Sequence, residues 1–393
     1  MPTLLQINVT SNWGSTGKIM EQIGLMAKIH GWDSYVAYGR HANPSQLKNI
    51  KIGNKLATYE HWFENFFFDR EGLASRYATR QFLKKVDIIK PDIVHLHNIH
   101  DHFLNYELLF EHLNKNEIPV VWTFHDCWAF TGHCCHFVQK NCRKWQTECT
   151  NCVMRNRFLD CSHKNFLLKK FFFVTCKNLT IVPCSNWMGD FVKKSFFKEK
   201  CIQVIHNGID LSTFKVLSNK KQCNDTFQII AVSNVWKQYK GIFDIFELRE
   251  MLSEYFKITI VGLTEEQIRS LPAGIQGISR TQNVQELVQL YNDADVLINP
   301  TYADTFPTVN LEALACGTPV ITYKTGGSPE AIDENTGIVV PQGDVKALSE
   351  AIIKLKENPL SSEACRKRAE MYFDKDKCFH EYIELYNEIL KKY

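Results

Sequence analysis

Residues 303–331 constrain the fold of this chain more than any other segment. The run reads ADTFPTVNLEALACGTPVITYKTGGSPEA, and it follows an apolar segment, residues 294–300, that is typical of a buried strand. Pro307 fits the first position of a helix, where its missing N–H is not needed, and apolar residues recur behind it at helical spacing. The run therefore predicts a strand, a loop and a helix in succession.

Two acidic residues in this run indicate a ligand. Asp304 falls in the predicted loop, and Glu312 lies about one and a half turns into the predicted helix. In an open parallel sheet this loop lies at the carboxyl end of its strand, where the free N–H groups of a helix start can hold a pyrophosphate. Two carboxylates beside such a site suit a nucleotide-sugar. The alternative is an ordinary strand–helix unit whose acids are incidental.

The run resembles, almost residue for residue, the donor-site signature of retaining GT-B glycosyltransferases of the large family four type, which includes many bacterial polysaccharide glycosyltransferases. The resemblance implies that Glu312 binds the ribose hydroxyls and that the N–H groups of Thr308 and Val309 face the diphosphate. It also implies that Asp304 holds the sugar. The family usually has Glu at this position, and the shorter Asp304 can still accept hydrogen bonds from sugar hydroxyls.

The length of the chain predicts two domains, because 393 residues exceed what one hydrophobic core usually sustains. Strand and helix patterns alternate in the first half and begin again after residues 207–214, with a polar linker expected at 215–225. We expect an α/β architecture of two Rossmann-like domains facing across a cleft, which is also the GT-B fold that the resemblance implies. Residues 1–206 would bind the acceptor, residues 207–375 would bind the nucleotide-sugar, and residues 376–393 would form a helix that crosses back to the first domain.

Three further segments supply candidate site residues. The loop after the first strand contains Gly14 and Gly17, lacks the Walker pattern, and resembles the family loop whose backbone approaches the donor phosphates. Two buried strands end in histidines, and His125, in the sequence TFH, matches the family histidine that contacts the donor sugar; we expect His125 and Asp304 to be the catalytic residues. The role of His97 stays open between a functional and a structural one.

The third segment, residues 231–241, reads AVSNVWKQYKG. The family carries an Arg and a Lys around this turn to neutralise the leaving diphosphate, and Lys240 matches the Lys. The Arg is missing. Either Lys237 supplies the second cation, or the diphosphate is held with less charge.

Fourteen cysteines are many for a reducing compartment, and seven of them lie between Cys127 and Cys161. The final C-x-x-C of this group can hold one tetrahedral metal, so we predict a structural zinc, with reduced thiols and disulfides as the alternatives. We expect no cofactor in catalysis itself. The predicted zinc ligands are Cys135, Cys142, Cys149 and Cys152.

Charge is unevenly distributed, since residues 140–221 contain 16 Lys or Arg against 5 Asp or Glu, interleaved with the aromatic runs LLKKFFF and FVKKSFF. Such a segment suits an anionic membrane surface that presents a lipid-linked acceptor, or else its Phe residues are core and its Lys residues are solvated. With no apolar span and no basic leader, we expect a cytoplasmic protein, with peripheral contact at the inner face of the membrane left open.

These features together predict a hexosyltransferase that moves a hexose from a nucleoside diphosphate sugar to a saccharide or lipid-linked acceptor in surface polysaccharide synthesis. The resemblance implies retention of configuration, with the leaving diphosphate taking the acceptor proton. No nucleic acid partner is expected. The alternatives are a nucleotide-sugar epimerase of the same fold and a binding protein whose donor site has decayed.

Overall fold

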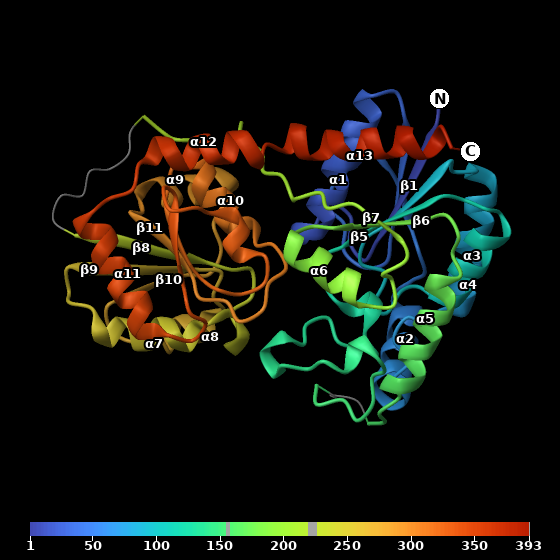
Figure 1. Ribbon diagram of the computed structural model, residues 1–393, viewed down its shortest axis with the longest axis horizontal. Coiled ribbons are helices and arrows are strands. Elements are labelled where there is room, and N and C mark those ends of the chain that lie inside the picture. Colours follow the sequence, from blue (N-terminus) through green and yellow to red (C-terminus); the bar gives the residue numbers. More distant parts are fainter. Residues whose placement is uncertain (155–157, 219–225, 393) are drawn as a thin grey trace. The chain divides into compact units, whose positions relative to one another are not determined.

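The computed structural model describes residues 1–154, 158–218 and 226–392 (Figure 1). The chain forms two compact units. Unit 1 comprises residues 1–206 and 379–393, and unit 2 comprises residues 207–378. Each unit contains one parallel β-sheet covered by helices, so the chain has the predicted α/β class. Of the predicted linker, residues 219–225 lie outside the described residues.

The sheet of unit 1 is parallel throughout, with strand order β3-β2-β1-β4-β5-β6-β7. Its central strands β4, β5 and β6 are buried along their whole length, as expected for strands with helices on both faces. The short, mostly exposed edge strand β3 was not predicted, because its sequence KNIK is polar. The strands are β1 (Thr3–Asn8), β2 (Asp33–Tyr38), β3 (Lys48–Lys51), β4 (Ile93–Leu96), β5 (Val120–Phe124), β6 (Leu179–Pro183) and β7 (Cys201–Ile202).

A break separates helices α2 and α3, which lie between β3 and β4. The break has a local cause: Gly72 has φ +76, and a Cβ there would lie 2.7 Å from the Tyr106 ring, so the chain turns where only glycine fits. The helices of unit 1 are α1 (Gly14–Ile29), α2 (Lys55–Phe68), α3 (Arg76–Ile89), α4 (Tyr106–Lys115), α5 (Ser162–Val174) and α6 (Asn186–Lys194).

The sheet of unit 2 is also parallel, with order β10-β9-β8-β11-β12-β13. Helix α10 packs with α12, and α7 packs with α11, and Figure 1 shows the two pairs on opposite sides of the sheet. The strands are β8 (Phe227–Val232), β9 (Phe256–Val261), β10 (Ile275–Ile278), β11 (Val296–Asn299), β12 (Val320–Tyr323) and β13 (Gly337–Val340). The helices are α7 (Ile242–Met251), α8 (Glu265–Arg269), α9 (Val284–Asp293), α10 (Thr308–Ala315), α11 (Val345–Glu357) and α12 (Ser362–Tyr372).

The last helix, α13 (Lys375–Leu390), begins in unit 2 and continues into unit 1. There the Tyr386 hydroxyl lies 2.6 Å from Nδ1 of His95, and the Tyr382 hydroxyl lies 3.0 Å from Oγ1 of Thr123. Two buried tyrosines thus fix the helix to strands β4 and β5. Among the described residues, no helix combines the length and the apolar composition that crossing a membrane requires.

Both sheets reverse their strand order at one place, between β1 and β4 in unit 1 and between β8 and β11 in unit 2. In open α/β sheets, ligands bind beside the carboxyl ends of the strands at such a switch point. The loops that follow β1, β4, β8 and β11 contain the Gly14 loop, the residues after His97, the Lys240 turn and Asp304. The topology therefore places most predicted site residues at the two switch points.

Candidate functional site

The loop after β11 leads into α10 as predicted, with a shift of one residue. Pro307 is the N-cap residue, with φ −70° and ψ 119°, and the helix begins at Thr308. Its extended ψ places Pro307 just outside the helix and not at the first helical position. The N–H groups of Thr308 and Val309 lie in the first turn, where an α-helix has no carbonyl of its own to accept them. Such free donors at the start of a helix can bind a ligand anion.

Two glycines bring neighbouring loops onto the loop that carries Asp304. A Cβ on Gly241 would lie 2.0 Å from the Pro300 carbonyl oxygen, and one on Gly326 would lie 1.7 Å from the Asp304 carbonyl oxygen. Both glycines also have positive φ, +75° and +57°. Larger residues cannot occupy either position, so the loops after β8, β11 and β12 form one assembly.

The ammonium of Lys240 and the carboxylate of Asp304 form an ion pair in this assembly. Lys240 Nζ lies 2.7 Å from Asp304 Oδ2, and each side chain is 22% exposed. Burial lowers the pKa of Lys240, but the neighbouring Asp304 carboxylate has the larger effect, so the pKa of Lys240 is raised above its usual value. Lys240 is therefore charged at neutral pH. Lys237, at the start of the same turn, is exposed to solvent.

Glu312 is held by a tyrosine that the sequence analysis missed. The buried Tyr291 of α9 donates its hydroxyl hydrogen to Glu312 Oε2 at 2.8 Å. Burial and the nearby Glu312 carboxylate raise the pKa of Tyr291 well above its usual range, so the phenol remains a donor. No spacing in the sequence links α9 to α10, and only the packed structure shows this partner.

A buried amide chain fixes the start of α10 to the sheet. Asn299 Nδ2 donates to Asn310 Oδ1 at 2.9 Å, and Asn310 Nδ2 donates to Ser328 Oγ at 2.9 Å. These bonds connect β11, α10 and the segment after Gly327. The first turn of α10 is therefore positioned before any ligand binds.

In unit 1, the loop after β1 has the two glycines that the sequence singled out. Gly14 begins α1 with φ +67°, and no atom lies within 4 Å of the place where its Cβ would be, so the backbone conformation alone requires glycine. Gly17 is buried, and a Cβ there would lie 2.7 Å from Thr10 Oγ1. The glycines allow the loop to fold tightly onto the first turn of α1.

His125, at the end of β5, belongs to a hydrogen-bonded row of three side chains. His97 Nδ1 lies 3.1 Å from His125 Nε2, and His97 Nε2 lies 3.1 Å from Gln6 Oε1. Because the Gln6 oxygen can only accept, His97 donates through Nε2 and accepts from His125 through Nδ1. Burial lowers the pKa of His125 to about 4 and that of His97 well below its usual value. Both rings are neutral at pH 7, and His97 sets the orientation of His125.

Asp126, the residue after His125, forms an ion pair with His100. His100 Nε2 lies 2.8 Å from Asp126 Oδ2. Burial opposes the charge of His100, but nearby Cys135 and Asp126 raise its pKa well above the usual value. This charged pair lies beside the neutral His97–His125 pair at the ends of β4 and β5.

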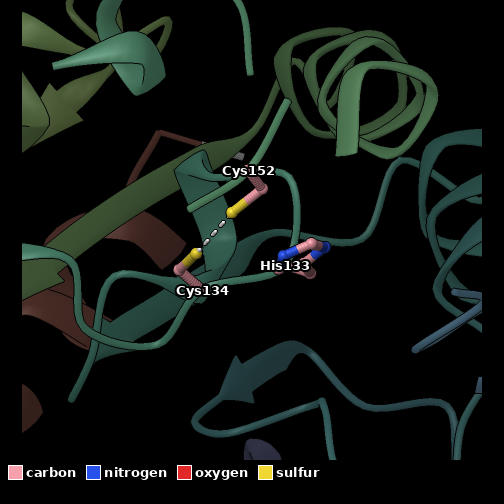
Figure 2. A group of neighbouring side chains, drawn as sticks. All are labelled: His133, Cys134 and Cys152. Carbon is pink, nitrogen blue, oxygen red and sulfur yellow. Dashed lines mark hydrogen bonds between the residues drawn. The ribbon is translucent and has the colours of Figure 1, made fainter. Parts of the chain in front are cut away.

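The four cysteines predicted to bind zinc do not come together as a set. Cys135 Sγ faces His100 Nε2 at 4.0 Å, whereas Cys152 Sγ lies 3.5 Å from Cys134 Sγ (Figure 2). The closely spaced groups of potential metal ligands among the described residues include His133 with Cys134 and Cys152, and none contains the predicted four. Cys134 and Cys135 are adjacent in non-helical backbone, where consecutive side chains point apart, so only one of them can face Cys152.

Residues 26–213 match the family described as Glycosyltransferase Family 4, and residues 226–358 match Glycosyl transferases group 1. Sucrose-phosphate synthase from Thermosynechococcus elongatus has the same fold over 100% of both chains, with a TM-score of 0.76 at 17% identity. This chain belongs to the GT-B glycosyltransferases. HepE from Anabaena, solved in complex with UDP-glucose, is a second structure of this fold, with a TM-score of 0.68 at 13% identity over 98% of this chain and 99% of HepE.

Two relatives of this GT-B chain are named for bacterial polysaccharide synthesis. WcaC of Escherichia coli, named as a colanic acid biosynthesis glycosyl transferase, is 25% identical over 275 residues, which cover 66% of each chain. CapM of Staphylococcus aureus, named as a capsular polysaccharide biosynthesis glycosyltransferase, is 28% identical over 225 residues, which cover 51% of this chain. The matched regions span 66% and 59% of the relatives' own lengths.

Proposed function

We propose that this chain is a retaining hexosyltransferase that transfers a hexose from a nucleoside diphosphate sugar to a saccharide or lipid-linked saccharide acceptor in surface polysaccharide synthesis. The observation that carries the proposal is the assembly in unit 2, where three contacting loops contain the Lys240–Asp304 pair and lead into the start of α10. The glycosyltransferase family models and the relatives named for polysaccharide biosynthesis support the transferase part of this proposal.

The diphosphate of the donor would bind the first turn of α10. The N–H groups of Thr308 and Val309, together with the positive end of the helix dipole, favour an anion there. Lys240 adds a full positive charge next to the same loop. Lys237 is exposed on the Lys240 turn and would supply the second cation in place of the missing Arg.

Glu312 would bind the ribose. A carboxylate accepts hydrogen bonds from two vicinal hydroxyls, and such bonds to a charged acceptor are stronger than neutral ones. The Tyr291 hydroxyl fixes Glu312 Oε2, so the carboxylate does not have to be ordered when the nucleotide arrives.

The hexose would lie beside Asp304, which accepts hydrogen bonds from its hydroxyls, and the family resemblance implies that His125 also contacts the sugar. In the transfer step, the bond between the anomeric carbon and the diphosphate oxygen breaks while the acceptor oxygen bonds to the same face. The acceptor proton moves to the departing diphosphate oxygen, and the products are the glycoside and a nucleoside diphosphate. Lys240 and the α10 amides stabilise the charge that grows on the leaving group.

A lipid-linked acceptor would bring the protein to a membrane surface, and unit 1 has exposed aromatic groups for this contact. In the two aromatic runs from which we predicted it, Phe173 and Phe197 lie in the core, whereas Phe171 is 62% exposed. Helix α2 carries a larger group of exposed aromatic side chains. They are Tyr59, Trp62, Phe63, Phe66 and Phe68, which are 41–68% exposed.

Sedimentation with vesicles that contain anionic lipid tests this contact. We expect the native chain to sediment and the double variant Trp62→Ser, Phe63→Ser to remain in solution, with Phe243→Ser, an exposed aromatic of unit 2, as the matched control. Equal binding of the native chain and the double variant would exclude α2 as the contact.

The transferase proposal is tested with a panel of uridine, guanosine and adenosine diphosphate sugars. We expect one of them to release nucleoside diphosphate at a rate that rises with added saccharide acceptor. Release of none would favour a binding protein. Conversion of the sugar without an acceptor would favour an epimerase.

A further inference from the structure

We propose that His133, Cys134, Cys149 and Cys152 form a structural zinc site in the segment that follows β5. The site is independent of the proposed donor site. Three of its ligand atoms, on His133, Cys134 and Cys152, lie within 4.8 Å of one another in the structure (Figure 2).

The spacing of the two sulfur atoms fits a shared metal ion. Cys134 Sγ and Cys152 Sγ are 3.5 Å apart. Two thiolates bound to one tetrahedral zinc at about 2.3 Å are about 3.8 Å apart, whereas a disulfide bond is only about 2.05 Å long. The observed separation is close to that of a zinc-bound pair and far from that of a disulfide.

His133 has the hydrogen bonding of a metal-binding histidine. Its Nδ1 lies 3.0 Å from Oδ2 of Asp69, which is fully buried. Nδ1 therefore carries a proton, which leaves Nε2 as the ring atom that can bind a metal. Nε2 is buried, and it has no hydrogen-bond partner among the described residues. A carboxylate behind the histidine is the usual second partner at protein zinc sites.

Cys149 completes the four ligands. It precedes Cys152 in a C-x-x-C, the spacing at which two cysteines bind one tetrahedral zinc. Its Sγ accepts a hydrogen bond from Gly132 N at 3.3 Å, which places it next to the turn that carries His133. The backbone N–H of Cys152 is fixed in turn by Asp160 Oδ2 at 2.9 Å. In the proposed site its sulfur joins the other three ligands.

The surroundings balance the charge of such a site. Three thiolates and one Zn²⁺ have a net charge of −1. The ammonium of Lys169, 1% exposed, lies under the same segment and donates to the carbonyl oxygens of Trp128 and Thr131 at 2.8 and 3.2 Å. The carboxylates of Glu71 and Asp69 and the Cys149 thiol all act electrostatically on this ammonium, so a negative zinc–thiolate centre would have a compensating buried cation nearby.

The neighbouring group of potential ligands, His100, Asp126 and Cys135, differs in one respect. His100 Nε2 is already bonded to Asp126 at 2.8 Å, so it is satisfied without a metal. Cys135 therefore serves as a matched control for Cys134, because the two are adjacent in sequence and their sulfurs face different partners.

Metal analysis of the full chain, purified under reducing conditions without chelator, tests the site. We expect about one zinc per chain in the native protein and the same content in Cys135→Ser. Cys134→Ser and Cys152→Ser should lose it. Absence of zinc from the native protein, retention of zinc in Cys134→Ser, or a Cys134–Cys152 disulfide in peptide mapping would each overturn the proposal.

Two further measurements test the sulfur ligands and the carboxylate partner of His133. Cobalt-substituted native protein should show a sulfur-to-cobalt charge-transfer band, and Cys149→Ser should lower its intensity by roughly a third, as expected when three thiolates become two. Asp69→Asn should weaken zinc affinity about 10- to 100-fold in a chelator competition. An unchanged band in Cys149→Ser or an unchanged affinity in Asp69→Asn would contradict the assigned ligand and its carboxylate partner.

Discussion

Replacing Lys240 by Ala separates transition-state stabilisation from donor binding. The side chain ends in an ammonium 2.7 Å from Asp304 Oδ2, and it is 22% exposed. Its backbone N–H donates to the Lys237 carbonyl at 2.8 Å, and this bond does not involve the side chain. Lys240→Ala should therefore fold normally while it removes one positive charge from the site.

The expected loss in rate is larger than the loss in affinity. Removing one donor from a site where negative charge grows in the transition state typically lowers kcat about 10²- to 10³-fold. A hydrogen bond between charged groups contributes about 1.5–3 kcal/mol, but in the free protein Lys240 already interacts with Asp304. Donor binding therefore gains only the difference between the Lys240–diphosphate interaction and the Lys240–Asp304 interaction that it replaces. We expect the donor Kd of Lys240→Ala to rise less than about 10-fold.

Steady-state kinetics give kcat, and calorimetry with the nucleoside diphosphate gives affinity. Lys257→Ala, which removes an exposed lysine of β9 in the same unit, is the matched control and should behave as the native chain does. If Lys240→Ala lowers kcat and affinity by the same factor, the lysine only binds the donor and its assignment to the departing diphosphate is wrong.

Three further changes test separate parts of the site. Glu312→Ala should weaken nucleotide binding about 10- to 150-fold, the loss of an ionic acceptor for ribose hydroxyls; unchanged calorimetric affinity would refute the assignment. Tyr291→Phe should weaken it less, because only the bond that orients the carboxylate is lost, and a larger loss than in Glu312→Ala would contradict this role. Burial lowers the pKa of His125 to about 4, below the unfolded value of about 6.5. The unfolded state therefore binds a proton on this ring below pH 6.5 while the folded state does not, and the free energy of unfolding falls by up to about 3 kcal/mol as pH drops toward 4. Urea unfolding at a series of pH values should show this decrease, and His125→Gln should reduce it.

Much of the fold follows from local sequence patterns. Buried parallel strands are continuous apolar runs, so the apolar segment at residues 294–300 predicted β11 to within two residues of its observed ends. The loop after β11 was predictable because Pro307 marks the start of the helix that follows it. These signals lie within about thirty consecutive residues, where spacing alone is informative.

Other features depend on contacts between distant segments. The edge strands β3 and β10 were missed because they are short and lack an apolar run. Tyr291 reaches Glu312 only through the packing of α9 against α10. The sequence likewise cannot tell which of the adjacent Cys134 and Cys135 faces Cys152, since that depends on the turn of the backbone.

Proton NMR of the anomeric centre of the product tests the proposed transfer most directly. With the preferred nucleoside diphosphate sugar and a saccharide acceptor, we expect a new glycosidic bond with the same anomeric configuration as the donor. One nucleoside diphosphate should appear for each bond formed, and Lys240→Ala should slow both signals equally. A product of inverted configuration, or nucleotide release without a new glycosidic bond, would contradict a retaining transferase.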